Sequence, residues 1–372
     1  MNLLRLKATS FRNLTALNIE LSNGFNLIYG LNGSGKTSIL ESIHYLSLGR
    51  SFRTNLSNRV IQYQADSFSV FGVSMDETGA TLAVGIEKFR QGKIRIKAGN
   101  DVTPTQAELA RVLPLQLINP DSYSLLIDGP KLRREFIDWG VFHVEPHFFS
   151  LWQRFQRALK QRNASLQQAA PPAQTKAWDV EMVTSAQDLA QLRRDYLQKL
   201  TPLFFIILAE LIELTDLTLE YHQGWEEGRN LVEVLESNFH RDLMQGYTQF
   251  GPQRADLVLK VQGSPVQDVL SRGEQKLVVL ALRLAQGVLL RDLTGKCCIY
   301  LLDDISAELD SERRRYVVKY LAKLEAQVFA TAVDQASLLE LIDYKTTKMF
   351  HVEQGVVLGA EKFPPLYGHK DR

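Results

Sequence analysis

A glycine-rich segment near the N-terminus has the residue types and spacing of a phosphate-binding loop. Its residues match G-x-x-x-x-G-K-[ST] at every fixed position, and they are Gly30, Leu31, Asn32, Gly33, Ser34, Gly35, Lys36 and Thr37. Glycines allow backbone N–H groups to turn inward around a phosphate. Lys36 would reach the β- and γ-phosphates of a nucleotide, and the Thr37 hydroxyl would ligate Mg²⁺. The loop therefore predicts ATP as the ligand and Mg²⁺ as its metal.

The segments that flank this loop match the context that phosphate binding requires. The apolar segment Phe25–Tyr29 precedes it as a predicted strand, and residues 37–48 follow it as a predicted amphipathic helix. A helix that begins at the loop directs its partially positive N-terminus toward the phosphate. A glycine-rich turn with an unrelated lysine does not need both neighbours, so we interpret the segment as a nucleotide site.

Two adjacent carboxylates, Asp303 and Asp304, supply the second half of the predicted site. They follow residues 297–302, a continuous apolar run that is typical of a strand buried in a parallel sheet. We assign Asp303 to Mg²⁺, through the metal's water shell. Asp304 is predicted to orient or deprotonate the attacking water, so Asp304 and Lys36 are the predicted catalytic residues. The alternative is a pair of solvated loop acids.

A polar segment before that strand resembles the signature motif of ABC ATPases. Its residues are Ser271, Arg272, Gly273, Glu274 and Gln275, an S-x-G-E-Q form of the motif, and a predicted helix follows them. In ABC ATPases the serine hydroxyl and the glycine N–H bind the γ-phosphate that the other protomer holds. A helix N-terminus suits that anion. The resemblance therefore implies an ATP-dependent homodimer with shared sites.

Other elements of the ABC pattern are assigned from their order along the chain. Residues 306–310 resemble the D-loop that follows the strand bearing the carboxylates. Gln116 is the candidate for the glutamine that senses Mg²⁺ and the γ-phosphate, with Gln106 as the alternative. Arg12, beside Phe11, could flank the adenine by stacking and a cation–π contact, and plain packing is the competing interpretation.

Several stretches resemble the RecF family of bacterial recombination and repair proteins, which are SMC-like ABC ATPases. They include residues 11–13, 48–54, 129–138 and 281–287, and the resemblance covers nearly the whole chain. The sequence departs from the family at residues 251–254, which read G-P-Q-R in place of G-P-H-R. It also departs at residues 306–307, where the D-loop serine and alanine are exchanged.

This resemblance implies more about function than the motifs do. It implies a slow ATPase whose hydrolysis times DNA binding and dimerisation. It also implies binding to gapped DNA and to junctions of single- and double-stranded DNA, and action with RecO and RecR in loading recombinase. Support of DNA replication and of the SOS response follows from the same resemblance.

The predicted fold is α/β, an ABC-type P-loop ATPase head with an antiparallel β subdomain and an inserted helical arm domain. Short strands fill the first hundred residues, and helical periodicity runs from about residue 121 to residue 249. We expect residues 1–118 and 250–372 to form the head and residues 119–249 to form the arm. The interval between the phosphate loop and the signature is too short for the long coiled coils of SMC proteins.

Charge and hydropathy restrict how the protein meets its partners. The net charge is only +1, so DNA contact needs a local basic patch or a groove between two copies. The candidates are Arg50, Arg53, Lys131, Arg133 and Arg134, with solvated faces or ion pairs as the alternative. The N-terminus lacks the apolar core of a secretion signal, and the longest apolar run, residues 202–209, cannot span a bilayer. We expect a cytoplasmic protein without membrane contact.

Two other functions are compatible with part of the pattern. A P-loop transferase that moves phosphate to a small molecule would use the loop, but it gives no account of residues 271–275 and would act as a monomer. A structural DNA-bridging module would bind ATP without hydrolysing it. Asp304, in place of a longer glutamate, leaves that second alternative open.

Overall fold

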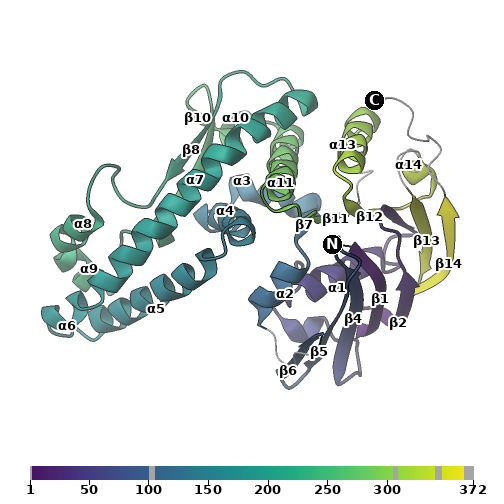
Figure 1. The fold of residues 1–372 in the computed structure, drawn as a ribbon, viewed down its shortest axis with the longest axis horizontal. Coiled ribbons are helices and arrows are strands. Elements are labelled where there is room, and N and C mark those ends of the chain that lie inside the picture. The colour runs from purple at the N-terminus through teal and green to yellow at the C-terminus, as the bar shows by residue number, and fades with distance from the viewer. Residues whose placement is uncertain (1, 100–104, 305–308, 340–345, 364–372) are drawn as a thin grey trace. The chain divides into compact units, whose positions relative to one another are not determined.

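The two ends of the chain build one unit and the middle of the chain builds another (Figure 1). The computed structural model describes residues 2–99, 105–304, 309–339 and 346–363. Unit 1 comprises Met1–Ser122 and Gly295–Arg372, and unit 2 comprises Tyr123–Thr294. The predicted α/β class is found, with a helical unit inserted between the two parts of unit 1.

Unit 1 contains a six-stranded sheet that brings distant segments together. The strand order from edge to edge is β14, β13, β3, β12, β11 and β7. Their bounds are β3 Phe25–Tyr29, β7 Leu115–Ile118, β11 Ile299–Leu302, β12 Gln327–Ala332, β13 Thr347–Glu353 and β14 Val356–Phe363. Neighbours pair in parallel except β14, which is antiparallel to β13. The central strands are buried, which is why their sequences are largely apolar rather than alternating.

A five-stranded antiparallel sheet forms the rest of the β structure of unit 1. Its order is β2, β1, β4, β5 and β6, with the bounds Leu14–Glu20, Asn2–Phe11, Ser67–Met75, Thr81–Phe89 and Ile94–Ala98. In β4 alternate residues are buried, because one face of this sheet packs against helix α1. Phe11, Tyr45 and Phe68 meet edge to face in that core. Among its described residues, unit 1 has the α-helices α1 Lys36–Leu48, α2 Gln106–Val112, α13 Ser311–Lys323 and α14 Ala336–Leu339.

The two sheets of unit 1 are joined by one buried amide. Gln327 begins β12, and its side chain is fully buried. Its Oε1 accepts from the Leu3 N–H of β1 at 2.7 Å, and its Nε2 donates to the carbonyls of Leu3 and Ser22 at 2.7 Å each. The amide thus satisfies buried backbone groups of Leu3 and Ser22.

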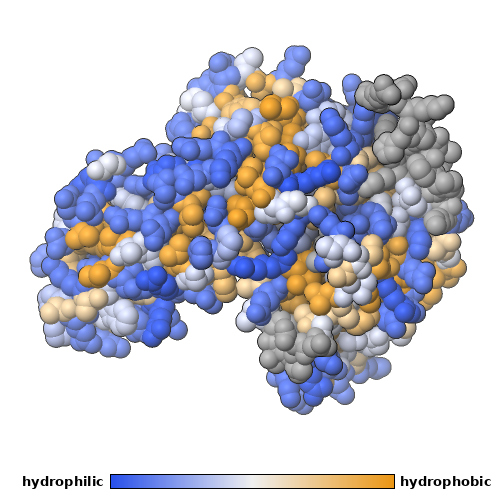
Figure 2. All heavy atoms as spheres, in the orientation of Figure 1, coloured by the Kyte–Doolittle hydropathy of each residue, from blue (hydrophilic) through white to orange (hydrophobic). Residues whose placement is uncertain are grey.

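Unit 2 is mostly helical. Its helices are α3 Ser124–Ile127, α4 Pro130–Val144, α5 Phe148–Gln167, α6 Pro172–Lys176, α7 Asp179–Leu211, α8 Leu231–Ser237, α9 Phe239–Gln245, α10 Val266–Val269 and α11 Arg272–Thr294. Helices α5 and α7 pack along each other, and Pro171 and Pro172 lie in the segment between them (Figure 1). Figure 2 shows hydrophilic side chains over much of the visible face. Within the part of the chain that the structure describes, no helix is both long and apolar enough to cross a bilayer.

Two features of unit 2 differ from the sequence prediction. A three-stranded antiparallel sheet of β8 Leu217–His222, β9 Asp256–Val261 and β10 Ser264–Pro265 is present, and β8 lies where only helix was expected. Residues 250–294, which were expected in the head, cluster with this unit. The reason is packing, since β9 pairs with β8 and α11 packs against α7 and α4.

A buried arginine connects the far ends of several unit 2 elements. Arg162 of α5 is fully buried and donates to Asp179 of α7, to Asp242 of α9 and to the Thr248 hydroxyl, each at 2.7 Å. Burial raises the pKa of Asp179, and the positive charge of Arg162 opposes that shift. The two carboxylates are tolerated inside the unit because the guanidinium lies between them.

Replacing Arg162 with methionine should therefore destabilise the protein strongly. Arg162→Met leaves two poorly solvated carboxylates without their cation, so the free energy of unfolding should fall by roughly 3–5 kcal/mol. Arg154→Met is the matched control, because Arg154 pairs with Glu181 at the surface, where such pairs contribute about 1 kcal/mol or less. Urea denaturation of the full chain measures both. Similar losses in the two variants would contradict the assignment.

Candidate nucleotide-binding site

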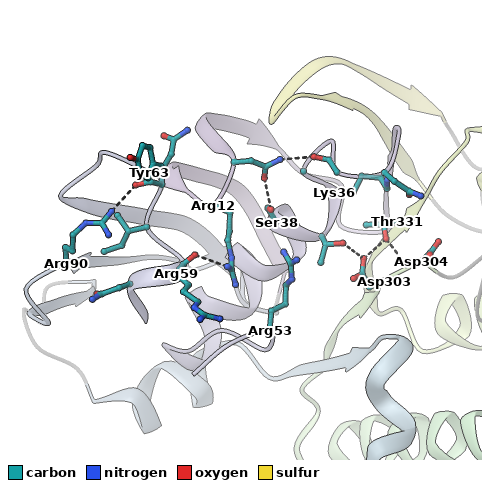
Figure 3. Close-up of a pocket in the computed structure, with 18 residues that line it drawn as sticks. Arg12, Lys36, Ser38, Arg53, Arg59, Tyr63, Arg90, Asp303, Asp304 and Thr331 are labelled. Carbon is teal, nitrogen blue, oxygen red and sulfur yellow. Dashed lines mark hydrogen bonds between the residues drawn. The ribbon is translucent and has the colours of Figure 1, made fainter. Parts of the chain in front are cut away.

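A cavity of about 720 Å³ lies in unit 1 at the carboxyl ends of the parallel strands (Figure 3). Its walls come from the turn between β1 and β2, the phosphate loop, the segment between α1 and β4, and the ends of β11 and β12. Lys36, Thr37, Asp303 and Asp304, predicted from two distant segments, all line it. Ligands of open α/β sheets bind at this edge.

The phosphate loop has the backbone that its glycines allow. Gly30, Gly33 and Gly35 have φ angles of 152°, 79° and 118°, in the region that residues with a Cβ rarely adopt. A Cβ on Gly30 would lie 2.2 Å from the carbonyl oxygen of Val352, so the loop also needs glycine there for space. Asn13 supports the loop from outside, because its Nδ2 donates to the Gly33 carbonyl at 3.2 Å and its Oδ1 accepts from Ser38 at 2.7 Å.

Lys36 is held inside the curve of this loop. Its ammonium donates to the carbonyls of Gly30 and Leu31 at 2.6 and 2.9 Å. Burial lowers the pKa of Lys36, and the negative charges of Asp304 and Asp303 oppose that shift. The charge is thus positioned beside the backbone donors that would surround a phosphate.

Thr331 connects the two halves of the site. It lies on β12, between the strands that carry the phosphate loop and the carboxylates, and its hydroxyl donates to Asp303 Oδ1 at 2.8 Å. The same oxygen of Thr331 accepts the Asp304 N–H at 2.8 Å. Thr37 donates to Asp303 Oδ1 at 3.1 Å. Burial raises the pKa of Asp303, and the bonds from Thr331 and Thr37 oppose that shift.

These oxygen groups fit Mg²⁺. The Thr37 hydroxyl lies within hydrogen-bond distance of the Asp303 carboxylate beside the phosphate loop. Asp304 lies next to Asp303 in the cavity wall (Figure 3). Among the described residues there is no cluster of three or more His, Cys, Asp or Glu side chains suited to a metal. Mg²⁺ does not need one, because it keeps several waters and takes one or two protein oxygens plus substrate phosphates.

Arg12 is aligned by a buried carboxylate that the sequence analysis missed. Glu41 of α1 is fully buried and accepts from Arg12 at 2.7 and 2.9 Å and from the Ser51 hydroxyl. Arg53 lies 3.6 Å from the same carboxylate. Arg12 and Arg53 both line the cavity, and Arg12 also bonds the Arg59 carbonyl (Figure 3). One glutamate therefore holds two arginines at the nucleotide cavity.

Two other predicted elements are placed differently or lie outside the described residues. Gln116 pairs with Tyr300, three residues before Asp303, and is not among the described residues that line the cavity. The Asp303 N–H donates to the carbonyl of Ile118, the last residue of β7. The residue that follows at the level of the metal site is therefore Asn119 and not Gln116. A metal role for Gln116 stays a prediction without support from this register. Of the D-loop, residues 306–308 lie outside the described residues.

The signature segment caps helix α11 in unit 2. The Ser271 hydroxyl accepts the Glu274 N–H at 3.3 Å, and the Glu274 carboxylate accepts the Ser271 N–H at 2.8 Å. Gln275 is buried and donates to the Leu270 carbonyl at 2.8 Å. Ser271, Arg272 and Gly273 are exposed, and no atom outside the segment crowds the Gly273 Cα. The segment is thus a preformed, solvent-facing helix start.

The five basic residues considered for DNA contact fall into different environments. Arg133 forms a two-bond ion pair with Asp256 at 2.7 and 2.9 Å, and Arg134 donates to the Ala255 carbonyl at 2.7 Å. Their donors are used within unit 2. Arg53 faces the nucleotide cavity, as described above. Arg50 and Lys131 are exposed, with Lys131 3.9 Å from Glu135.

Comparison with known proteins agrees with this geometry. The family model described as RecF/RecN/SMC N terminal domain matches residues 2–357. The DNA replication and repair protein RecF of Pseudomonas putida strain GB-1 is 48% identical over 357 residues, which cover 95% of this chain and 97% of that protein. The chain belongs to the RecF family. The Vibrio campbellii RecF is 46% identical, over 95% of this chain and 99% of its own length.

Solved structures give the same assignment. A structure of the recombination mediator protein RecF with ATP superposes with a TM-score of 0.84 at 25% identity, over 97% of both chains. An Smc head domain of Pyrococcus furiosus matches with a TM-score of 0.60 at 15% identity, which shows a shared fold alone. The chain is therefore a RecF-type, SMC-like member of the ATP-binding ATPases, related to DNA replication and repair proteins.

Thr331 offers a test of the metal site that leaves every predicted ligand in place. Thr331→Val removes the hydroxyl that orients Asp303, so the Mg²⁺ concentration needed for half-maximal ATP turnover should rise about 10- to 100-fold. Thr331→Ser keeps the hydroxyl and should stay near the wild type. Magnesium titrations of ATPase activity measure both. Equal magnesium requirements in the two variants would contradict this role for Thr331.

Proposed function

We propose that this protein is an ATP-driven dimeric clamp on DNA. ATP and Mg²⁺ bind in the unit 1 cavity, and the signature segment of a second copy completes the site at the γ-phosphate. Hydrolysis then releases the dimer and the DNA. The ATPase acts as a timer, and turnover is slow.

The exposed signature segment carries this proposal. Ser271 and Gly273 begin a 23-residue helix, face solvent, and offer a hydroxyl and a backbone N–H at its partially positive end. A second copy can supply the missing donors, and a two-fold dimer forms the contact twice. A P-loop transferase has no use for such a segment.

The roles of the cavity residues follow from their contacts. Lys36 would neutralise phosphate charge, while Thr37 and Asp303 would hold Mg²⁺, which would supply positive charge against the negative charge that develops during transfer. Asp304 orients the attacking water. Its φ of 53° is a conformation that Asp tolerates better than most residues, and the bond from its N–H to Thr331 fixes it there. Arg12 and Arg53, aligned by Glu41, line the cavity and would contact the nucleotide there.

DNA and protein partners are proposed from the relatives. The related structure is described as a recombination mediator in the RecFOR pathway, and we extend its RecO and RecR partnership to this chain. Gapped DNA and single-strand to double-strand junctions are the proposed substrates. Arg50 and Lys131 are the exposed candidates for phosphate contact, and closure of two copies doubles whatever basic surface each one offers.

Asp304→Asn should separate nucleotide binding from hydrolysis. Asparagine keeps the size of the side chain and also tolerates a positive φ, but it cannot act as a base. Single-turnover hydrolysis should fall by roughly 10²- to 10⁴-fold, while ATP binding persists. The ATP-bound dimer and its DNA complexes should live correspondingly longer in a competition assay. Unchanged single-turnover hydrolysis would assign the base elsewhere.

Mixing two inactive variants tests the shared site directly. Ser271→Arg should leave ATP binding to one protomer nearly intact, since Lys36 and Thr37 are unchanged, but its bulky cation should block ATP-induced dimerisation. Lys36→Ala should lose ATP binding. In a mixed dimer, one site has wild-type residues from both copies, so ATP hydrolysis and ATP-dependent DNA retention should partly return.

The control is each variant alone at the same total concentration, where neither activity should return. Light scattering with and without ATP reports dimerisation. If Ser271→Arg dimerises normally with ATP, the signature does not meet a partner's γ-phosphate. The transferase alternative would then become the better account.

A further inference from the structure

A second cavity, of about 490 Å³, lies within unit 2 and involves none of the ATPase motifs. Two loops form it: residues 222–226, which follow β8, and residues 247–254, which lie between α9 and β9. The second loop contains the G-P-Q-R stretch at which this sequence departs from the family pattern. No step of the proposed ATPase cycle uses either loop.

The side chains of this cavity provide flat surfaces and a cation. Trp225, Tyr247 and Phe250 all line it. The Arg254 guanidinium lies over the Tyr247 ring, 5.3 Å from its centroid. Aromatic rings and arginine planes are the groups on which unpaired nucleobases stack, with little dependence on sequence.

One polar group in the cavity wall lacks an acceptor. The Nε2 of Gln249 is buried and has no hydrogen-bond partner among the residues that the structure describes. A buried amide donor without a partner is unfavourable, and rotation of the Gln249 side chain toward the cavity would let an acceptor on a bound molecule satisfy it. Every nucleobase carries carbonyl oxygens or ring nitrogens at its edge that can accept such a bond.

The two loops of the cavity are fixed by contacts between their backbones and by a buried arginine. The Gly251 N–H bonds the Gly224 carbonyl at 3.1 Å, and a Cβ on Gly224 would lie 2.1 Å from the Gly251 oxygen. Arg193 is almost fully buried, forms a two-bond ion pair with Asp138, and donates to the Pro252 carbonyl at 2.9 Å. The two loops are thus fixed together before any ligand arrives, which reduces the ordering cost of binding.

We propose that this cavity binds an unpaired base of single-stranded DNA. The base stacks on the Trp225 and Tyr247 side of the cavity, Gln249 donates to its edge, and the exposed Arg254 meets the adjoining phosphate. Glu226 is the acidic residue in the wall, and its charge faces Arg229 at 3.4 Å. A paired base cannot enter, so the site distinguishes gapped DNA from intact duplex. This inference rests on the proposed DNA-binding function and names the feature of the DNA that is read.

The test uses the full chain with ATP and Mg²⁺ and a duplex that contains a short single-stranded gap with 2-aminopurine. Stacking should quench 2-aminopurine fluorescence in the wild type and in Tyr247→Phe, which keeps the ring. Tyr247→Leu keeps apolar bulk but loses the ring, so quenching should disappear and affinity for the gapped DNA should fall about 5- to 150-fold. Gln249→Met, which removes the free donor, should reduce any preference among bases placed in the gap.

A blunt duplex and an abasic gap separate the outcomes. Affinity for the blunt duplex, ATP binding and ATP-dependent dimerisation should be the same in Tyr247→Leu and in the wild type, because Tyr247 is 38% exposed and outside the core. If wild-type protein binds gapped DNA without quenching, or binds the abasic gap equally well, no base is bound here. If Tyr247→Leu binds every DNA normally, the cavity serves a protein side chain instead. Failure of all DNA binding by the wild type would refute the clamp and not this site alone.

Discussion

The parallel alignment of β3, β12 and β11 is the constraint on which the nucleotide site depends. The phosphate loop follows β3 and the carboxylates follow β11, so 266 residues separate Thr37 from the Asp303 oxygen that it contacts. The strand between them carries Thr331 next to its last residue, and the single hydroxyl of Thr331 bonds both Asp303 and the Asp304 backbone. A shift in register of any of these strands would separate the lysine from the acids. The chemistry is thus set by backbone pairing before any ligand binds.

Local motifs were predictable because their chemistry and their backbone lie in the same few residues. The phosphate loop needs its glycines for positive φ angles, and the signature needs a polar helix start, so each can be read from a short segment. Gln116 shows the limit of prediction from short segments. Its role depends on where β7 ends relative to β11, and the ends of strands are hard to predict from sequence. Glu41 was missed although a carboxylate inside an apolar helix is a signal. Its partners come from two other segments.

Unit 2 was harder to predict because its contacts are less local. Strand β8 is only six residues long, and its partner β9 follows it in the chain only after helices α8 and α9. The helical pattern of the surrounding sequence therefore concealed this strand. Because β9 pairs with β8, residues 250–294 belong to this unit, and they include the signature segment. The helical character of the segments that form α5 and α7 was predicted, since long helices that bury one face carry a periodic apolar pattern.

Internal ion pairs also change what the charge count means for DNA. The sequence has 43 lysines and arginines against 42 acids, yet Arg12, Arg133, Arg162 and Arg193 each bind carboxylates within their own unit. These arginines stabilise the fold and the nucleotide cavity, and they add little to a surface field. Because the net charge is only +1, a single copy has no large excess of positive charge, so an intact duplex should hold it weakly. Two routes compensate: dimerisation, which presents each contact twice, and stacking on exposed bases, which needs no charge. Both favour DNA with a gap, held by two copies, over plain duplex held by one.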